Sequence, residues 1–263
     1  RSVALLKRAL GRTAPVLAVT HSTRVRRLCK ADAVIALTDA LRRDIQAESR
    51  GKPLPVYVVP NRIKTPAGGC PQPRPLRHPP VIGALGRFDR VKGFDVFIEA
   101  LAQLAGQGVM FQAKLAGTGE DEKRLREQIR TCGLVDAVEL SGWIPREGTD
   151  SFLSGLDLLC VPARSDAFGL TPLQGAAASV PLLLSRASGH LAMFDEDTEA
   201  LFFDVGDAAA LASQIQHFLY DPALQKQLPT AAFERITRCY SETTITRGIM
   251  NAIDNTRLLF DNT

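Results

Sequence analysis

The sequence predicts an α/β protein built on a doubly wound parallel sheet. Short apolar runs, such as residues 156–161, alternate along the chain with amphipathic segments such as residues 94–104. Several of these runs lead directly through a glycine-containing turn into the next amphipathic segment. Buried parallel strands read as continuous apolar runs, and strands that alternate with helices indicate βαβ units.

The composition is that of an ordinary globular protein. Of the 263 residues, 45% are hydrophobic and 23% are charged. No run approaches the ~20 apolar residues of a membrane-spanning helix. The five cysteines show no C-x-x-C spacing, which argues against a disulfide framework or zinc site and favours a reducing, cytosolic setting. The chain starts without Met or a signal-peptide core, so we expect it to begin inside a longer protein.

The net charge of +4 is unevenly distributed along the chain. Residues 1–52 hold twelve Lys or Arg and four Asp or Glu, a balance of +8, so the remainder sums to −4. Such a basic part can face anionic lipid or a phosphorylated acceptor. The alternative is an arginine-rich, solvated helix face.

The first 64 residues predict about two and a half βα units. Residues 3–10 and 39–48 read as helices, the second capped by Thr38. Three apolar runs read as strands, namely 15–20, 33–37 and 55–61. Residues 65–80 contain six prolines and two glycines without periodicity and predict a linker.

From residue 80 onward, strands and helices alternate more regularly. Strands are predicted at 81–86, 111–116, 137–140, 156–161, 180–184 and 201–203. Helices are predicted at 94–104, 120–132, 147–154, 208–219, 222–238 with breaks, and 243–260. We therefore expect four parts: residues 1–64 as the rest of an N-terminal Rossmann-like domain, 65–80 as linker, 81–238 as a second Rossmann-like domain, and 239–263 as a C-terminal helix.

Residues 165–181 form the first motif with chemical potential. They read Ser-Asp-Ala-Phe-Gly-Leu-Thr-Pro-Leu-Gln-Gly-Ala-Ala-Ala-Ser-Val-Pro and follow a predicted buried strand. Thr171 is predicted to cap a helix whose first turn contains Pro172. Such a helix N-terminus directs N–H groups and a positive dipole end at a crevice where phosphate can bind. Asp166 and Gln174 are expected to flank that crevice; the alternative is an ordinary turn between strand and helix.

A second motif, Gly-Arg-Phe-Asp-Arg-Val-Lys-Gly at residues 86–93, follows another strand and precedes a helix. Arg87 can hold a diphosphate through its guanidinium fork, and Lys92 can do so as a point charge. The alternative is a pair of solvated loop cations.

These two motifs, about 80 residues apart, resemble those of the retaining glycosyltransferases of family 4, which have the GT-B fold. The family carries Gly-Arg, a loop and Lys-Gly at the first place. At the second it carries Glu-Gly-Phe-Gly-Leu, two residues and Leu-Glu-Ala. Here Asp166 and Gln174 replace the two glutamates, while 168–170 and Leu173 fit. The resemblance runs from about residue 15 and implies that ~100 residues are missing upstream. It also implies that 81–238 is the nucleotide-sugar-binding domain, that 1–64 lies on the acceptor side, and that 239–263 is a crossover helix.

The resemblance assigns a role to each candidate residue. Arg87 and Lys92 hold the donor diphosphate and neutralise the leaving group, together with Phe168, Gly169 and Leu170. Gln174 contacts the ribose, while Trp143 and Ile144 lie against the base. Asp166 acts on the transferred sugar, and so does His21, which opens a His-Ser-Thr segment. Weaker candidates are Gly86, Gly117, Gly119 and Gly189. A packing role for Trp143 and a structural or surface role for His21 remain alternatives.

The resemblance implies a glycosyltransferase that moves sugar from a UDP-, GDP- or ADP-sugar to a saccharide or lipid-linked acceptor of the cell envelope. No metal is expected, because cations and a helix dipole meet the leaving-group charge. We expect no nucleic-acid partner, and a cytoplasmic protein, peripheral on the inner face of the plasma membrane. The alternatives are a catalytically impaired nucleotide- or carbohydrate-binding relative and a nucleotide-sugar epimerase.

Overall fold

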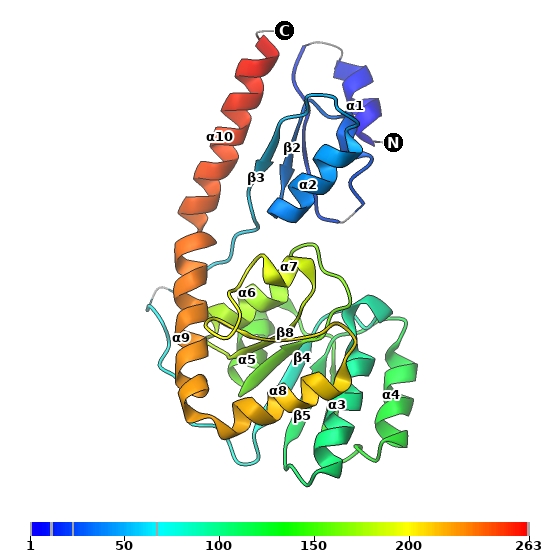
Figure 1. Cartoon of the computed structure of the whole chain (residues 1–263), viewed down its shortest axis with the longest axis vertical. Helices are drawn as coiled ribbons and strands as arrows, with labels where there is room; N and C mark the ends of the chain where they lie inside the picture. Colours follow the sequence, from blue (N-terminus) through cyan, green and yellow to red (C-terminus); the bar gives the residue numbers. More distant parts are fainter. Residues whose placement is uncertain (1, 11–12, 23, 67, 262–263) are drawn as a thin grey trace. The chain divides into compact units, whose positions relative to one another are not determined.

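The structure is a computed structural model that describes residues 2–10, 13–22, 24–66 and 68–261 (Figure 1). The chain divides into two compact units. The first unit holds the described residues up to Lys64, the short segment Asp166–Phe168, and those from Arg238 onward. The second unit holds the rest, from Thr65 to Ser165 and from Gly169 to Thr237.

The first unit contains a parallel sheet in the order β1-β2-β3. Its strands are β1 (Leu17–Val19), β2 (Ala33–Ala36) and β3 (Val56–Val58). Its helices are α1 (Ser2–Leu10), the 3-10 turn η1 (Leu28–Lys30), α2 (Asp39–Glu48) and α10 (Glu242–Asp261). The predicted cap of α2 is confirmed, because the Thr38 hydroxyl accepts a hydrogen bond from the Leu41 amide.

Helix α10 belongs to this first unit although it comes last in the chain. Its buried residues Ile245 and Ala252 form one apolar cluster with Ile35 of β2 and with Val59, which follows β3. Burial of this apolar area stabilises the attachment of the C-terminal helix to the N-terminal strands.

The second unit is a doubly wound sheet of six parallel strands in the order β6-β5-β4-β7-β8-β9. The strands are β4 (Val81–Leu85), β5 (Gln112–Ala116), β6 (Val138–Gly142), β7 (Leu158–Val161), β8 (Leu182–Ser185) and β9 (Leu201–Phe203). The helices are η2 (Arg90–Lys92), α3 (Phe94–Gly106), α4 (Glu122–Thr131), η3 (Arg146–Gly148), α5 (Thr149–Ser154), α6 (Leu170–Ala177), α7 (Ser188–Leu191), α8 (Ala208–Tyr220) and α9 (Pro222–Cys239). The chain order of the strands reverses between β4 and β7, which makes this pair the switch point of the sheet.

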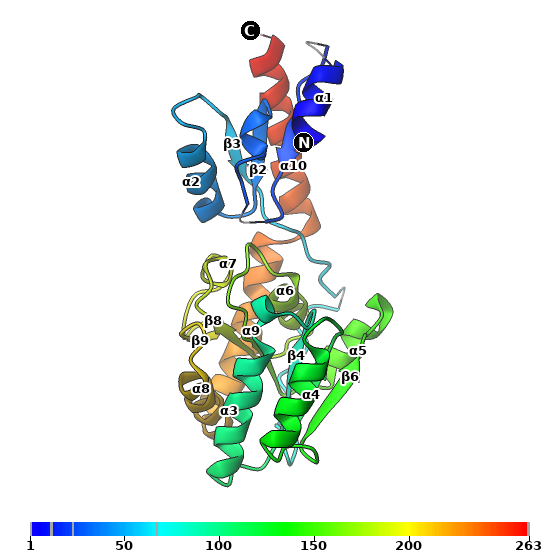
Figure 2. The ribbon, with the colours of Figure 1, turned by 90° about the vertical axis from the view of Figure 1, so that its right-hand side faces the viewer.

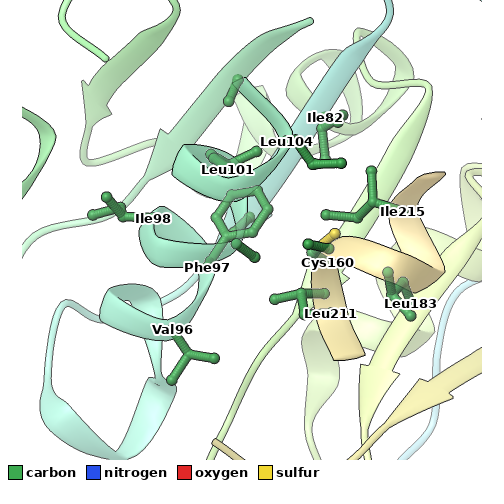
Figure 3. Packing of buried hydrophobic residues seen from close by; sticks show 14 of the residues in the cluster. Ile82, Val96, Phe97, Ile98, Leu101, Leu104, Cys160, Leu183, Leu211 and Ile215 are labelled. Carbon is green, nitrogen blue, oxygen red and sulfur yellow. The ribbon is translucent and has the colours of Figure 1, made fainter. Parts of the chain in front are cut away.

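Alternate residues of the central strands supply the two apolar layers of this unit. Leu158 and Cys160 of β7 join the cluster formed with α3 and α8, which includes Phe97 and Ile215 (Figure 3). On the opposite face, α6 packs so closely that a Cβ at Gly175 would lie 2.5 Å from a methyl group of Leu159. Figure 2 shows α3 and α8 on one face of the sheet and α5 and α6 on the other.

Helix α9 differs from the prediction, which was wrong in expecting breaks within residues 222–238. The helix is continuous and contains Pro229. An internal proline costs roughly 3 kcal/mol through a lost hydrogen bond and a steric clash. Here Leu228, Pro229, Ala232 and Phe233 are all buried, and the packing of this face offsets the cost.

Candidate functional site

Two loops leave the sheet of the second unit at its switch point. One follows β4 and carries Arg87 and Lys92, and the other follows β7 and leads into α6. Both loops lie at the carboxyl ends of parallel strands, where open α/β sheets bind their ligands. The structure therefore brings the two sequence motifs, about 80 residues apart, to adjacent strands.

The β4–α3 loop holds its two candidate cations differently. Arg87 is 75% exposed, and its Nε donates to Oδ2 of Asp89 over 2.5 Å. Asp89 is nearly buried, and its other oxygen accepts the Lys92 amide at 3.1 Å, so Asp89 caps the turn η2. Lys92 is half-buried at the end of that turn. The loop thus presents one exposed guanidinium, held by a nearly buried carboxylate, and one half-buried lysine.

Two of the weaker glycine candidates, Gly117 and Gly119, have a packing reason for their positions, whereas a Cβ on Gly86 would meet no atom closer than 3.7 Å. A Cβ on Gly117, where φ is +145°, would lie 1.8 Å from the carbonyl oxygen of Gly86. A Cβ on Gly119 would lie 2.2 Å from that of Phe88, whose amide donates to Thr118 at 2.9 Å. The β5–α4 turn therefore supports the β4–α3 loop by direct backbone contact.

The second motif begins helix α6, but the predicted Thr171 is not the residue that caps it. Gly169 is the N-cap and supplies no side-chain bond, so the prediction that Thr171 caps this helix was wrong. Thr171 lies within the first turn, and its hydroxyl donates to the carbonyl of Leu85 at the end of β4, over 3.4 Å. This contact ties the start of α6 to the neighbouring strand. Leu170 is 50% exposed, and Gln174 is half-buried one turn later.

Asp166 and Phe168, on the same stretch of chain, belong to the first unit. The carboxylate of Asp166 accepts the Phe168 amide at 3.2 Å. Phe168 is buried, with its ring edge-on to Tyr240 at 5.7 Å between centroids. Phe168 therefore has a core role beside any ligand role of its amide.

His21 also lies in the first unit, directly after the β1 region, and is exposed. The preceding Thr20 is buried, and its hydroxyl donates to the carbonyl of Ser22 at 2.7 Å, which shapes the turn. The third residue of the predicted His-Ser-Thr segment, Thr23, lies outside the described residues.

Trp143 follows β6, just after Gly142, which has a φ of +70°. Its side chain is 70% exposed, so the packing alternative was wrong for this residue. Ile144 beside it is half-buried. An exposed indole at the carboxyl edge of the sheet offers a flat surface for stacking.

Gly189, the remaining glycine candidate, lies in a helix. It is buried within α7, whose backbone has ordinary helical geometry. The next residue, His190, is fully buried, with Nδ1 3.0 Å from the carbonyl oxygen and 3.2 Å from the hydroxyl oxygen of Ser185. That hydroxyl donates to Ala163 at 2.6 Å, so this network braces the ends of β7 and β8. Sequence reasoning gave His190 no role.

Sequence reasoning also missed Asp95 and Arg164. Both side chains are largely shielded, and they form a two-pronged pair at 2.7 and 2.9 Å. Burial acts to raise the pKa of Asp95, but the hydrogen bonds and charge of Arg164, with the charge of Arg124, outweigh it and hold the pKa below 3.8. No local motif signals this pair, because its partners lie 69 positions apart.

Within the part of the chain that the structure describes, no three His, Cys, Asp or Glu side chains are grouped so as to hold a metal ion. The absence of a metal from the reaction stays a prediction. No helix among the described residues is both long and apolar enough to span a bilayer.

Comparison with known proteins finds a family model and curated relatives that match more than half of the chain. The family model of glycosyl transferases group 1 matches residues 72–235. The lipopolysaccharide core biosynthesis glycosyltransferase LpsD of Rhizobium meliloti (strain 1021) is 29% identical over 174 residues, which are 66% of this chain and 49% of that protein. The putative colanic acid biosynthesis glycosyltransferase WcaL of Escherichia coli (strain K12) is 30% identical over 155 residues, or 56% and 38%. The chain thus spans about half the length, or less, of these curated relatives.

Solved structures agree in fold. Anabaena Alr3699/HepE in complex with UDP and glucose superimposes with a TM-score of 0.80 at 18% identity, over 96% of this chain and 74% of that one. A TarM mutant of S. aureus, in a complex that includes UDP, gives a TM-score of 0.77 at 18% identity, over 87% and 45%. These likenesses confirm the predicted α/β fold of GT-B type.

Proposed function

Because the chain belongs to the glycosyl transferases group 1 family, we propose that it moves a sugar from a nucleoside-diphospho-sugar to a saccharide or lipid-linked acceptor of a cell-envelope glycan. We further propose that it is a retaining enzyme of family 4 in which Asp166 and Gln174 replace the two motif glutamates. The relatives LpsD and WcaL, named for lipopolysaccharide core and colanic acid biosynthesis, support the class of acceptor. Their greater length supports the proposal that further N-terminal residues complete the enzyme.

One observation carries the donor assignment. Arg87, Lys92 and the N-terminus of α6 lie at the carboxyl ends of β4 and β7, the two strands of the switch point. A diphosphate there meets a guanidinium fork, an ammonium and the amides of a helix start. In this proposal the exposed guanidinium of Arg87 exchanges its pairing with Asp89 for pairing with phosphate when the donor binds.

We propose that the remaining candidate residues contact different parts of the donor. In our proposal the amides of Phe168, Gly169 and Leu170 contact phosphate, and Gln174 hydrogen-bonds the ribose. Trp143 and Ile144 contact the base, UDP being supported by the ligands of the matched structures.

Asp166 and His21 would serve the transferred sugar. Asp166 keeps the negative charge of the family glutamate, which can stabilise a developing cationic sugar ring. His21 would donate or accept a hydrogen bond at a sugar hydroxyl. Positive charge on Arg87, Lys92 and the helix dipole would meet the leaving diphosphate, so the proposed reaction uses no metal.

The basic balance of residues 1–52 supports a cytoplasmic enzyme that is peripheral on an anionic membrane. Its binding to vesicles containing anionic lipid should weaken with added salt, because screening shortens the reach of exposed charges. Absent or salt-independent binding would contradict this part of the proposal.

The function is tested by radiolabelled sugar transfer. UDP-, GDP- and ADP-sugars are offered with saccharide and lipid-linked acceptors, and the stereochemistry of the product is read by NMR. Transfer with retention supports the proposal. Tight nucleotide binding without turnover supports the impaired-relative alternative, and interconversion of donor sugars without an acceptor supports an epimerase.

A further inference from the structure

The side chain of Arg164 connects the end of β7 to the β4–α3 loop and the start of α3. Its guanidinium donates to both carboxylate oxygens of Asp95, at 2.7 and 2.9 Å, and to the carbonyl of Arg90 at 2.9 Å. Its backbone amide donates to the carbonyl of Val91 at 2.7 Å. Arg164 follows β7, whereas Arg90, Val91 and Asp95 follow β4, so all four bonds join the ends of neighbouring strands.

Asp95 lies in the first turn of α3, directly after the β4–α3 loop, and links the start of that helix to α4. Arg124 of α4 lies 3.5 Å from its carboxylate, and Gln128 donates to its backbone carbonyl at 2.9 Å. The side chains of Arg164 and Asp95 are 31% and 18% exposed, whereas the surface pair Arg130–Glu127 is 70% and 60% exposed. A shielded, two-pronged pair holds its geometry better than an exposed one.

The backbone beneath this pair leaves little room for adjustment. A Cβ on Gly93 would lie 2.0 Å from the carbonyl oxygen of Pro162. The β4–α3 loop therefore touches the end of β7 through bare backbone, two residues before Arg164. Lys92 directly precedes Gly93, so the backbone contact and the side-chain link both act beside this candidate cation.

We propose that Arg164 and Asp95 are positioning residues that hold the diphosphate-binding loop, with Arg87 and Lys92, in register with the β7–α6 loop. The inference rests on the proposed function, since it concerns the donor diphosphate. Neither residue touches the ligand; both act through the loop. A displacement of about 1 Å in a group that positions substrate can cost on the order of a hundredfold in rate.

The test compares Arg164→Gln and Asp95→Asn with the parent chain and with Arg130→Gln, which breaks an exposed Arg–Glu pair on α4. The probes are UDP, GDP and ADP, measured by calorimetry, and uridine, guanosine and adenosine, measured by ligand-observed NMR. Each site variant should weaken the best-bound diphosphate by about tenfold or more. Nucleoside affinity should change by no more than about twofold, the usual limit for independent sites.

A purely structural role predicts a different result, namely a lower melting temperature with an unchanged ratio of diphosphate to nucleoside affinity. That result overturns the inference. Arg164→Lys keeps the charge without the fork and should give an intermediate loss. It also replaces Arg164→Gln in the test if the glutamine variant does not fold.

If the parent binds none of the probes, the proposed function fails, and hydrogen exchange in the ligand-free chain decides the inference. The Lys92 and Arg164 amides, bonded to Asp89 and Val91, should then exchange faster in Asp95→Asn than in Arg130→Gln. Equal exchange at both amides overturns the loop coupling.

Discussion

At the scale of single residues, Arg87 and Lys92, the two proposed diphosphate ligands, differ in exposure and pairing in the ligand-free chain. Arg87 is exposed and paired with Asp89, whereas Lys92 is half-buried at the end of η2. We expect Arg87→Ala and Lys92→Ala each to weaken nucleoside diphosphate binding by ~1.5–3 kcal/mol, the scale of a hydrogen bond to a charged group. Calorimetry checks this, with Arg126→Ala on α4 as the control. Affinity equal to the parent's in both variants would refute the diphosphate clamp.

Gln174 and Asp166 should differ in what their substitution changes. Gln offers a neutral carbonyl where the family has a charged acceptor, so Gln174→Glu should tighten donor binding by ~1 kcal/mol, roughly five- to tenfold. Asp166→Asn should instead lower turnover at nearly unchanged binding, because it removes only the charge. The control is Gln107→Glu, the same change at an exposed position just after α3. Intact turnover in Asp166→Asn would remove the catalytic assignment.

The lowered pKa of Asp95 predicts a specific dependence of folding stability on pH. Its pKa is lower in the folded chain than the ordinary 3.8, so its contribution is fully present above about pH 4 and is lost as pH falls through the folded value. Urea unfolding at pH 7, 4 and 3 should show Asp95→Asn less stable than the parent at pH 7. The difference should shrink toward pH 3. A constant difference would mean that Asp95 stabilises the chain without its charge.

At the scale of elements, Gly93 avoids two separate energetic costs of a side chain: strain in a left-handed backbone and a steric collision with the end of β7. Gly93 and Gly108 have similar φ angles, +69° and +77°, but a Cβ would collide with Pro162 only at Gly93 and would meet nothing within 4 Å at Gly108. Both alanine variants lose ~1–2 kcal/mol from the left-handed backbone. Gly93→Ala should lose a further ~1–3 kcal/mol from the collision. Equal unfolding free energies for the two variants would show that the β4–α3 loop yields freely.

The sequence was most informative where local signals and packing agree. The strands around 81–86 and 201–203 and the cap at Thr38 were predictable, because apolar runs and a hydroxyl before a helix act over a few residues. The prediction that Thr171 caps α6 was wrong, because its hydroxyl instead donates to the carbonyl of Leu85 on another strand. The Asp95–Arg164 pair had no signal at all, since it exists only once β4 and β7 are neighbours.

At the scale of the whole molecule, the chain first passes from one unit to the other between Lys64 and Thr65. The predicted linker, 65–80, contains no helix or strand in its described part, yet its second half is attached to the second unit. Arg77 pairs at 2.8 Å with Asp157, whose side chain is only 4% exposed, and also donates to the carbonyl of Ser154. Arg74 donates to the carbonyl of Leu156.

Only the first half of this segment should therefore behave as a linker under limited proteolysis. Trypsin should cleave after Lys64, which is exposed and has no ion pair among the described residues, well before it cleaves after Arg77. The fragment that starts at Thr65 should keep the thermal transition of the β4–β9 sheet, because its core lies within that unit. Asp157→Asn, which weakens the pair, should speed cleavage after Arg77 while leaving cleavage after Lys64 unchanged. Mass spectrometry of timed digests reads both sites, and preferred cutting within 85–160 would show that the second unit does not fold as an independent domain.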